Sequence, residues 1–115
     1  MNPGGDVPQI EADDADRQVA GGALLLDVRE PDEWAAGHAP AARHLPMGEV
    51  PASYGDLPEG IDILVICRTG ARSQQAAEFL RAQGRSAANV SGGMRSWMAQ
   101  GLPVVAADGF EGVVI

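Results

Sequence analysis

Residues 61–66 form the most strand-like run in the chain, and a short loop and a helical pattern follow it without a break. The run reads Ile-Asp-Ile-Leu-Val-Ile and is almost entirely apolar, as expected of a strand that is buried on both faces. Cys67 comes directly after it, and the loop Arg-Thr-Gly-Ala-Arg leads into a helical pattern over residues 71–83. This succession of strand, tight loop and helix favours an α/β architecture with parallel strands.

The rest of the chain repeats this alternation of short strands and helices. Further strands are predicted at residues 9–11, 23–28, 43–45 and 87–90, and helices at residues 13–20 and 32–36 and directly after the glycine pair at 92–93. We expect Asp13 or Asp14 to cap the first helix. The stretch 47–57 is ambiguous, because its proline and glycine limit any helix to a turn or two. The pattern predicts a three-layer α/β domain with a mainly parallel, about five-stranded central sheet flanked by helices.

The length of 115 residues is that of one domain with a substantial core. We expect a flexible N-terminus at residues 1–8, the folded domain at 9–105, and a C-terminal tail at 106–115 whose apolar end has no evident partner. No apolar run approaches the roughly 20 residues that a membrane span requires. The first residues lack the basic and apolar parts of a leader peptide. The sequence therefore predicts a cytoplasmic protein that does not bind membranes.

Charge is distributed unevenly along this acidic chain. The formal net charge is −8 and every basic residue is an arginine. Residues 67–95 hold five arginines and one acid, whereas the remainder holds three arginines and fifteen acids. An acidic exterior argues against nucleic acid as a partner. The basic segment that begins at the cysteine indicates instead a site for a small anion.

Cys67 is the single cysteine, which excludes an internal disulfide and a cysteine-rich metal cage. We expect neither a metal nor an organic cofactor. A buried cysteine often serves only in packing. A helix N-terminus and neighbouring arginines, however, can lower a cysteine pKa from about 8.5 to between about 3.5 and 7.5. Gly70 frees the loop backbone, and the small side chains of Thr69 and Ala71 leave room for converging N–H groups. Arg72 can close one side of this bowl with its forked guanidinium.

Several segments carry a resemblance to a known family. In chain order they are residues 25–30 (LLDVRE), 33–34 (EW), 37–38 (GH), 42–46 (ARHLP), 67–73 (CRTGARS), 92–97 (GGMRSW) and 101–103 (GLP). Together they make the chain resemble a single-domain rhodanese, a sulfurtransferase, over roughly residues 9–105. Ala39 and Ala41 depart from the family's frequent Ile and Gly, and the tail from residue 106 lies outside the resemblance.

The resemblance implies sulfur transfer through a covalent intermediate. The thiolate of Cys67 would take the outer sulfur of thiosulfate or a related donor and carry it as a persulfide, until a thiol or cyanide removes it. The N–H groups of the loop, from Arg68 to Arg72, would hold the persulfide, and the two arginines would hold the sulfonate end of the donor. The expected partners are a small-molecule sulfur donor, a thiol acceptor and a sulfur-relay protein.

Three further residues are expected to support the site without reacting: Asp27, Arg29 and Ser73. Asp27 ends a predicted strand, where it can accept hydrogen bonds from loop N–H groups or from a loop arginine. Arg29 can pair with Glu33 or Glu30.

Two other functions fit parts of the pattern. A cysteine phosphatase or arsenate reductase also pairs a cysteine with an arginine, but with five intervening residues, whereas four separate Cys67 from Arg72. The shorter loop suits a terminal sulfur better than a tetrahedral phosphate. The other alternative is a module with little or no catalytic turnover that carries sulfur or binds a partner, which the acidic exterior and the apolar tail leave open.

Overall fold

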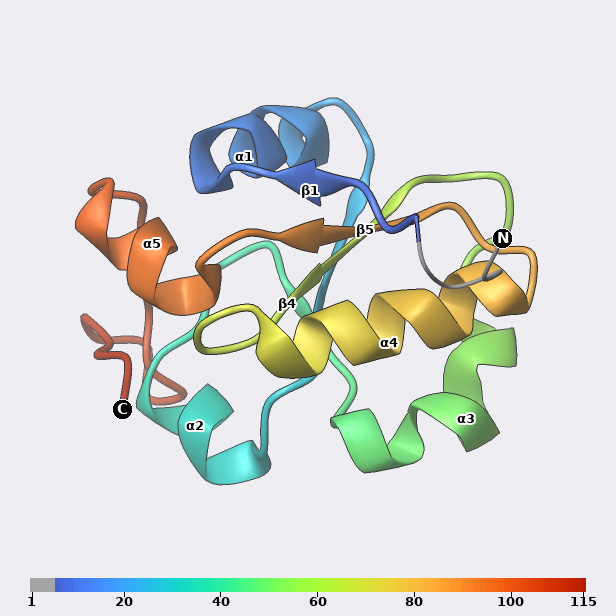
Figure 1. The fold of residues 1–115 in the computed structure, drawn as a ribbon. Helices are drawn as coiled ribbons and strands as arrows, with labels where there is room; N and C mark the ends of the chain where they lie inside the picture. Colours follow the sequence, from blue (N-terminus) through green and yellow to red (C-terminus); the bar gives the residue numbers. More distant parts are fainter. Residues whose placement is uncertain (1–5) are drawn as a thin grey trace.

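The computed structural model of the protein describes residues 6–115, and a five-stranded sheet forms its centre (Figure 1). The strands are β1 (Gln9–Ile10), β2 (Leu24–Asp27), β3 (Arg43–His44), β4 (Ile63–Ile66) and β5 (Ala87–Val90). Their order across the sheet is β1-β5-β4-β2-β3, and every neighbouring pair is parallel. The predicted α/β domain with a parallel five-stranded sheet is confirmed.

Residues 6–115 also form five α-helices, of which the first four lie between strands and the last follows β5: α1 (Ala12–Ala20), α2 (Pro31–Ala36), α3 (Val50–Ser53), α4 (Ala71–Ala82) and α5 (Gly93–Ala99). The ambiguous stretch consists of α3 between two 3₁₀ turns, Met47–Glu49 and Tyr54–Asp56. The predicted cap of α1 is wrong. Its N-cap residue is Glu11, without a capping hydrogen bond from its side chain, and Asp13 and Asp14 lie in the first turn, where the helix dipole favours negative charge.

The two faces of the sheet are covered by different helices (Figure 1). Along β4, Ile63 and Val65 pack with residues of α3 and α4, whereas Leu64 and Ile66 pack with residues of α1 and α5. This alternation follows from the period of two in a strand. All four β4 side chains are buried, which explains why this run is the most apolar in the chain.

The strand register brings three strand ends together at one edge of the sheet. Asp27 of β2 pairs with Ile66 of β4, so the two residues after these strands lie side by side. On the other side of β4, Val65 pairs with Asn89 of β5. Because parallel strands end at the same edge, the starts of α2, α4 and α5 meet around Cys67.

The tail segment, residues 106–115, lies against the end of α2. The N–H groups of Ala107 and Val113 donate to the carbonyls of Ala35 and Ala36, at 3.0 and 2.9 Å. The end of the chain therefore packs beside the edge of the sheet that carries Cys67.

At the other end of the chain, Val7 is buried, and the carbonyl of Pro8 accepts a hydrogen bond from the N–H of Asn89. Residues 1–5, part of the stretch expected to be flexible, lie outside the described residues. No helix in the described part of the chain, residues 6–115, has the length and apolar character needed to cross a membrane.

Candidate active site

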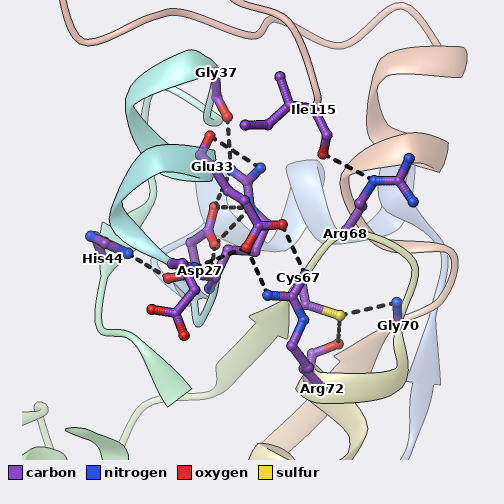
Figure 2. A network of polar contacts seen from close by, with 12 residues as sticks. Asp27, Glu33, Gly37, His44, Cys67, Arg68, Gly70, Arg72 and Ile115 are labelled. Atoms are coloured by element: carbon purple, nitrogen blue, oxygen red, sulfur yellow. Dashed lines mark hydrogen bonds and ion pairs between the residues drawn. The ribbon is translucent and has the colours of Figure 1, made fainter. Parts of the chain in front are cut away.

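Cys67 occupies the turn between β4 and α4, and its side chain is only 1% exposed. Its Sγ accepts a hydrogen bond from the backbone N–H of Gly70, with a nitrogen–sulfur distance of 3.1 Å (Figure 2). The hydroxyl of Ser73 lies 3.2 Å from the same sulfur atom. The sulfur therefore faces donors from the loop and from the first turn of α4, the surroundings that stabilise a thiolate.

Gly70 has the conformation that this turn requires. Its φ of 110° lies in a region that residues other than glycine rarely adopt. Gly70 is also the N-cap of α4. The turn directs the N–H of Gly70 to the sulfur, while its carbonyl accepts from the N–H of Gln74 in the first turn of the helix. A single loop thus starts the helix and closes around the thiol.

The pKa of the Cys67 thiol reflects two opposing influences. Burial raises the pKa, because it disfavours the charged thiolate. Hydrogen bonds from the Ser73 hydroxyl and from the backbone N–H groups of Ser73, Gly70 and Thr69 lower the pKa. The hydrogen bonds outweigh burial, so the pKa of Cys67 lies below its usual value.

Arg72 forms a two-pronged ion pair with Glu33 of α2 (Figure 2). Its two terminal nitrogens lie 2.7 and 2.9 Å from the two carboxylate oxygens. The hydrogen bond from Arg72, with a further one from the N–H of Glu30, lowers the pKa of Glu33 to about 2, although partial burial acts to raise it. The arginine expected to hold the donor is therefore already neutralised by a carboxylate.

Arg68 also has a partner within the chain. Its Nε donates to the backbone oxygen of Ile115 at 3.0 Å, which places the tail segment beside the active-site loop (Figure 2). The side chains of Thr69 and Ala71 are exposed, in keeping with an open loop. The structure thus brings the whole loop from Cys67 to Arg72 together with two elements, α2 and the tail, that lie far from it in the sequence.

Asp27 and Arg29 pair with each other instead of with the loop. Both side chains are fully buried, and the guanidinium makes contacts of 2.8–3.1 Å with the two carboxylate oxygens. The guanidinium also donates to the carbonyls of Gly37, at 2.7 Å, and Glu33, at 3.4 Å. The expected pairing of Arg29 with the carboxylate of Glu33 or Glu30 is therefore wrong, because the nearer Asp27 provides a fully buried counter-ion. The pair ties the end of β2 to both ends of α2.

Two residues beside the loop were not recognised as site residues from the sequence. The sequence predicts Glu33 as part of the EW motif and as a partner of Arg29, yet it holds Arg72. Asn89 accepts a hydrogen bond from Ser73 with an oxygen–oxygen distance of 2.5 Å. The available signal was a lone polar residue in an otherwise apolar predicted strand, since a buried amide needs partners.

The fold and the site define an α/β domain whose buried thiol, at the carboxyl edge of a parallel sheet, is surrounded by hydrogen-bond donors. The chain matches the rhodanese-like domain over residues 11–100. It belongs to the rhodanese-like family, as the sequence motifs indicated. Membership supports sulfur transfer as the general chemistry.

Two relatives whose names refer to sulfur chemistry align with this chain, one over most of it and the other over part of it. A sulfurtransferase of Allochromatium vinosum is 38% identical over 106 residues, which are 90% of this chain and 99% of that protein. A putative sulfur carrier protein of Bacillus subtilis, YrkF, is 42% identical over 74 residues, covering 64% of this chain and 40% of that protein. The match to YrkF therefore spans less than half of that longer protein.

A solved structure gives the same fold. A rhodanese-related protein from Thermoplasma volcanium superposes with a TM-score of 0.80 at 35% identity, covering 85% of this chain and 97% of that one. The five-stranded α/β domain is thus shared with a relative of known structure.

Proposed function

We propose that the protein is a sulfurtransferase that moves sulfane sulfur from thiosulfate, or a related donor, to a thiol through a persulfide on Cys67. The observation that carries this proposal is the arrangement around Sγ, which receives an N–H from Gly70 and lies beside the Ser73 hydroxyl. These donors lower the pKa of the thiol, so that the thiolate forms without a separate general base. We place the activity in the cytoplasm.

The first half-reaction forms the persulfide. The Cys67 thiolate attacks the outer sulfur of thiosulfate, a new sulfur–sulfur bond forms, and the bond between the two donor sulfurs breaks. Sulfite leaves with the bonding electron pair, and Cys67 keeps the transferred sulfur as a persulfide anion. The total charge is the same before and after, so neither an oxidant nor a proton is required.

The second half-reaction regenerates the enzyme. An acceptor thiolate attacks the terminal sulfur of the persulfide and leaves with it, and the bonding pair returns to Sγ of Cys67. Cyanide removes the same sulfur as thiocyanate. This is ping-pong catalysis, in which the donor product leaves before the acceptor reacts.

The loop supplies the binding groups for both halves. The backbone N–H groups of Thr69, Gly70 and Ser73, which lower the pKa of the thiol, stabilise negative charge on the persulfide. Arg72 holds the sulfonate of the donor and must exchange part of its contact with Glu33 to do so. Asp27 and Arg29 hold β2 and α2 in place around the loop.

Intact mass spectrometry tests the proposal directly. The wild-type protein treated with thiosulfate is expected to gain the mass of one sulfur atom, which a reducing thiol removes, and Cys67→Ser is expected to gain nothing. Measured turnover with thiosulfate and cyanide should also be lost in Cys67→Ser. A wild-type protein that hydrolyses p-nitrophenyl phosphate but never gains sulfur would contradict the proposal.

A second candidate is a sulfur carrier that loads slowly and delivers to a protein partner. The observation in its favour is that both loop arginines have partners within the chain, Arg72 with Glu33 and Arg68 with Ile115. Such a protein would gain one sulfur on Cys67 but show little multiple turnover with thiosulfate and cyanide. Comparing the loading rate with the turnover rate distinguishes the carrier from the enzyme.

A further inference from the structure

Asn89 is the one polar residue of β5, and its carboxamide lies behind the active-site loop. Its side chain is buried, with the residue only 4% exposed. Its Oδ1 lies 2.5 Å from Oγ of Ser73, and its Nδ2 lies 3.2 Å from the carbonyl oxygen of Gly70 and 2.9 Å from Oε1 of Gln9. Asn89 therefore contacts Ser73 and Gly70, two of the residues whose donors reach the sulfur of Cys67.

The contacts fix which way the carboxamide of Asn89 faces. Its NH₂ group has two oxygen acceptors, so the amide oxygen must face Ser73. Gln9 agrees with this orientation, because its own NH₂ group donates to Oε1 of Gln74 at 2.7 Å and leaves its oxygen free to accept. The hydrogen bonds thus run in one direction, from Ser73 to Asn89 to Gln9 and on to Gln74.

The hydroxyl of Ser73 has one proton and two neighbours. It lies 2.5 Å from the Asn89 oxygen and 3.2 Å from Sγ of Cys67. A serine in the first turn of a helix can instead rotate towards the carbonyl of the preceding turn, here that of Thr69. Because the hydroxyl has a single proton and Oδ1 of Asn89 only accepts, the Asn89 oxygen and Sγ of Cys67 compete for that proton, and the shorter contact gives it to Asn89.

We propose that Asn89 is a positioning residue for the sulfur chemistry of Cys67, acting through the Ser73 hydroxyl. The inference deepens the proposed function and depends on it for its purpose. It adds a residue from β5 to a site otherwise built on β4, α2 and α4. Asn89 has no contact with the sulfur itself, so its effect must pass through the groups it holds.

Charged side chains also lie around the active-site loop. Arg68, Arg72 and Glu33 are drawn in Figure 2, and the buried Asp27–Arg29 pair lies at the end of β2. None of them hydrogen-bonds to Asn89 within the described residues 6–115. A change in the titration of Cys67 after substitution of Asn89 therefore reports on its contacts with Ser73 and Gly70, and the Ser73→Ala background separates the two.

The test is a double-mutant cycle read by the pH dependence of alkylation. Cys67 is reacted with iodoacetamide in the wild-type protein, Asn89→Leu, Ser73→Ala and the double variant. Asn89→Leu keeps a similar side-chain volume and is expected to lower the midpoint of the pH–rate curve by about one unit, because the Ser73 proton is then free to donate to the thiolate. In the Ser73→Ala background the same substitution should move the midpoint much less.

The control is Ser91→Ala. The Ser91 hydroxyl also contacts Gln9 but has no contact with Ser73, so its removal should leave the midpoint of the pH–rate curve unchanged. A midpoint that Asn89→Leu leaves unmoved, or moves equally in both backgrounds, overturns the proposal. If Asn89→Leu does not fold by circular dichroism, Asn89→Ser replaces it in the same cycle with the same expectations. Alkylation needs no sulfur donor, so a protein that fails to gain sulfur but passes this test refutes the proposed function alone.

Discussion

At the level of single residues, the ion pair between Arg72 and Glu33 sets the charge that surrounds the proposed anion site. Both carboxylate oxygens are engaged, and the Glu33 side chain is 14% exposed against 37% for Arg72. Under the proposed function, a donor such as thiosulfate meets an arginine whose charge is already compensated by Glu33. We therefore expect Glu33 to reduce the positive charge that Arg72 offers to the donor.

Replacing either partner should change donor use in opposite directions. Arg72→Ala is expected to lower kcat/KM for thiosulfate by about 10- to 100-fold, because a hydrogen-bonded contact to a charged group is lost. Glu33→Gln is expected to raise it, because Arg72 regains its charge. Steady-state kinetics with thiosulfate and cyanide measure both. The free energy of unfolding of Arg72→Ala should fall by no more than about 1 kcal/mol, since the pair is partly exposed. Wild-type kinetics in Arg72→Ala would show that Arg72 does not bind the donor.

The same carboxylate predicts a pH-dependent contribution to stability. The pKa of Glu33 in the folded protein is about 2, below its ordinary value of 4.5. The ion pair therefore stabilises the folded state above pH 4.5, and this contribution is lost as the pH falls towards 2. Thermal unfolding of the wild type and Glu33→Gln should differ most near neutral pH and converge near pH 2. A difference in Tm that stays constant over this range would contradict the assignment.

Sequence reasoning located the loop of the candidate site but not its surroundings. The residues from Cys67 to Ser73 are contiguous, so their motif and the start of α4 could be recognised together. Glu33 and Asn89 belong to other elements and reach the loop only through the parallel register of β2, β4 and β5. Arg29 has several acidic residues nearby in the sequence. Its pairing with Asp27 depends on burial, which a local sequence pattern does not show.

At the level of elements, the tail segment forms part of the site's surroundings. It pairs with the end of α2, and Ile115 accepts from Arg68. Its close approach depends on Gly37, where an added Cβ would lie 2.3 Å from the carbonyl oxygen of Val113 and 2.8 Å from a methyl carbon of Val104. The φ of Gly37 is 177°, which any residue adopts, so only this crowding requires glycine.

Gly37→Ala should therefore loosen the tail. We expect the free energy of unfolding to fall by about 1–3 kcal/mol, the usual cost of overpacking, as measured by urea denaturation. Gly48→Ala is the matched control, because nothing lies within 4 Å of the position of its Cβ. Equal stability of the two variants would mean that the tail does not pack tightly on α2.

Elements with strong periodic patterns could be predicted, and those shaped by tertiary contacts could not. The strand predicted at residues 61–66 from its apolar run contains β4, and the helix predicted at residues 71–83 from its apolar face contains α4. The tail could not be predicted because it is hydrogen-bonded to the C-terminal end of α2, some seventy residues earlier in the chain. The short α3 with its two 3₁₀ turns likewise has no periodicity long enough to identify.

At the level of the whole molecule, the topology places the reactive loop on the most protected strand. β4 is hydrogen-bonded on both sides, by β2 and β5, and helices cover both faces. β1 and β3 are two-residue strands at the sheet edges. The side of the site formed by α2 and the tail segment is held by fewer contacts, because α2 has no buried side chain of its own.

Hydrogen exchange should follow this difference in packing between the central strand and the tail segment. The amides of β4 are expected to exchange only through global unfolding, whereas those of Ala107 and Val113 in the tail should exchange through local opening at a lower free energy. Exchange measured by NMR on the reduced protein gives both values, and urea denaturation gives the global free energy for comparison. If the tail amides were as protected as those of β4, the tail would belong to the same cooperative unit as the sheet. Donor entry would then require movement of the loop itself. Faster exchange in the tail, with the Gly70 amide protected, would instead place the opening at α2 and the tail and leave the groups that hold the sulfur unmoved.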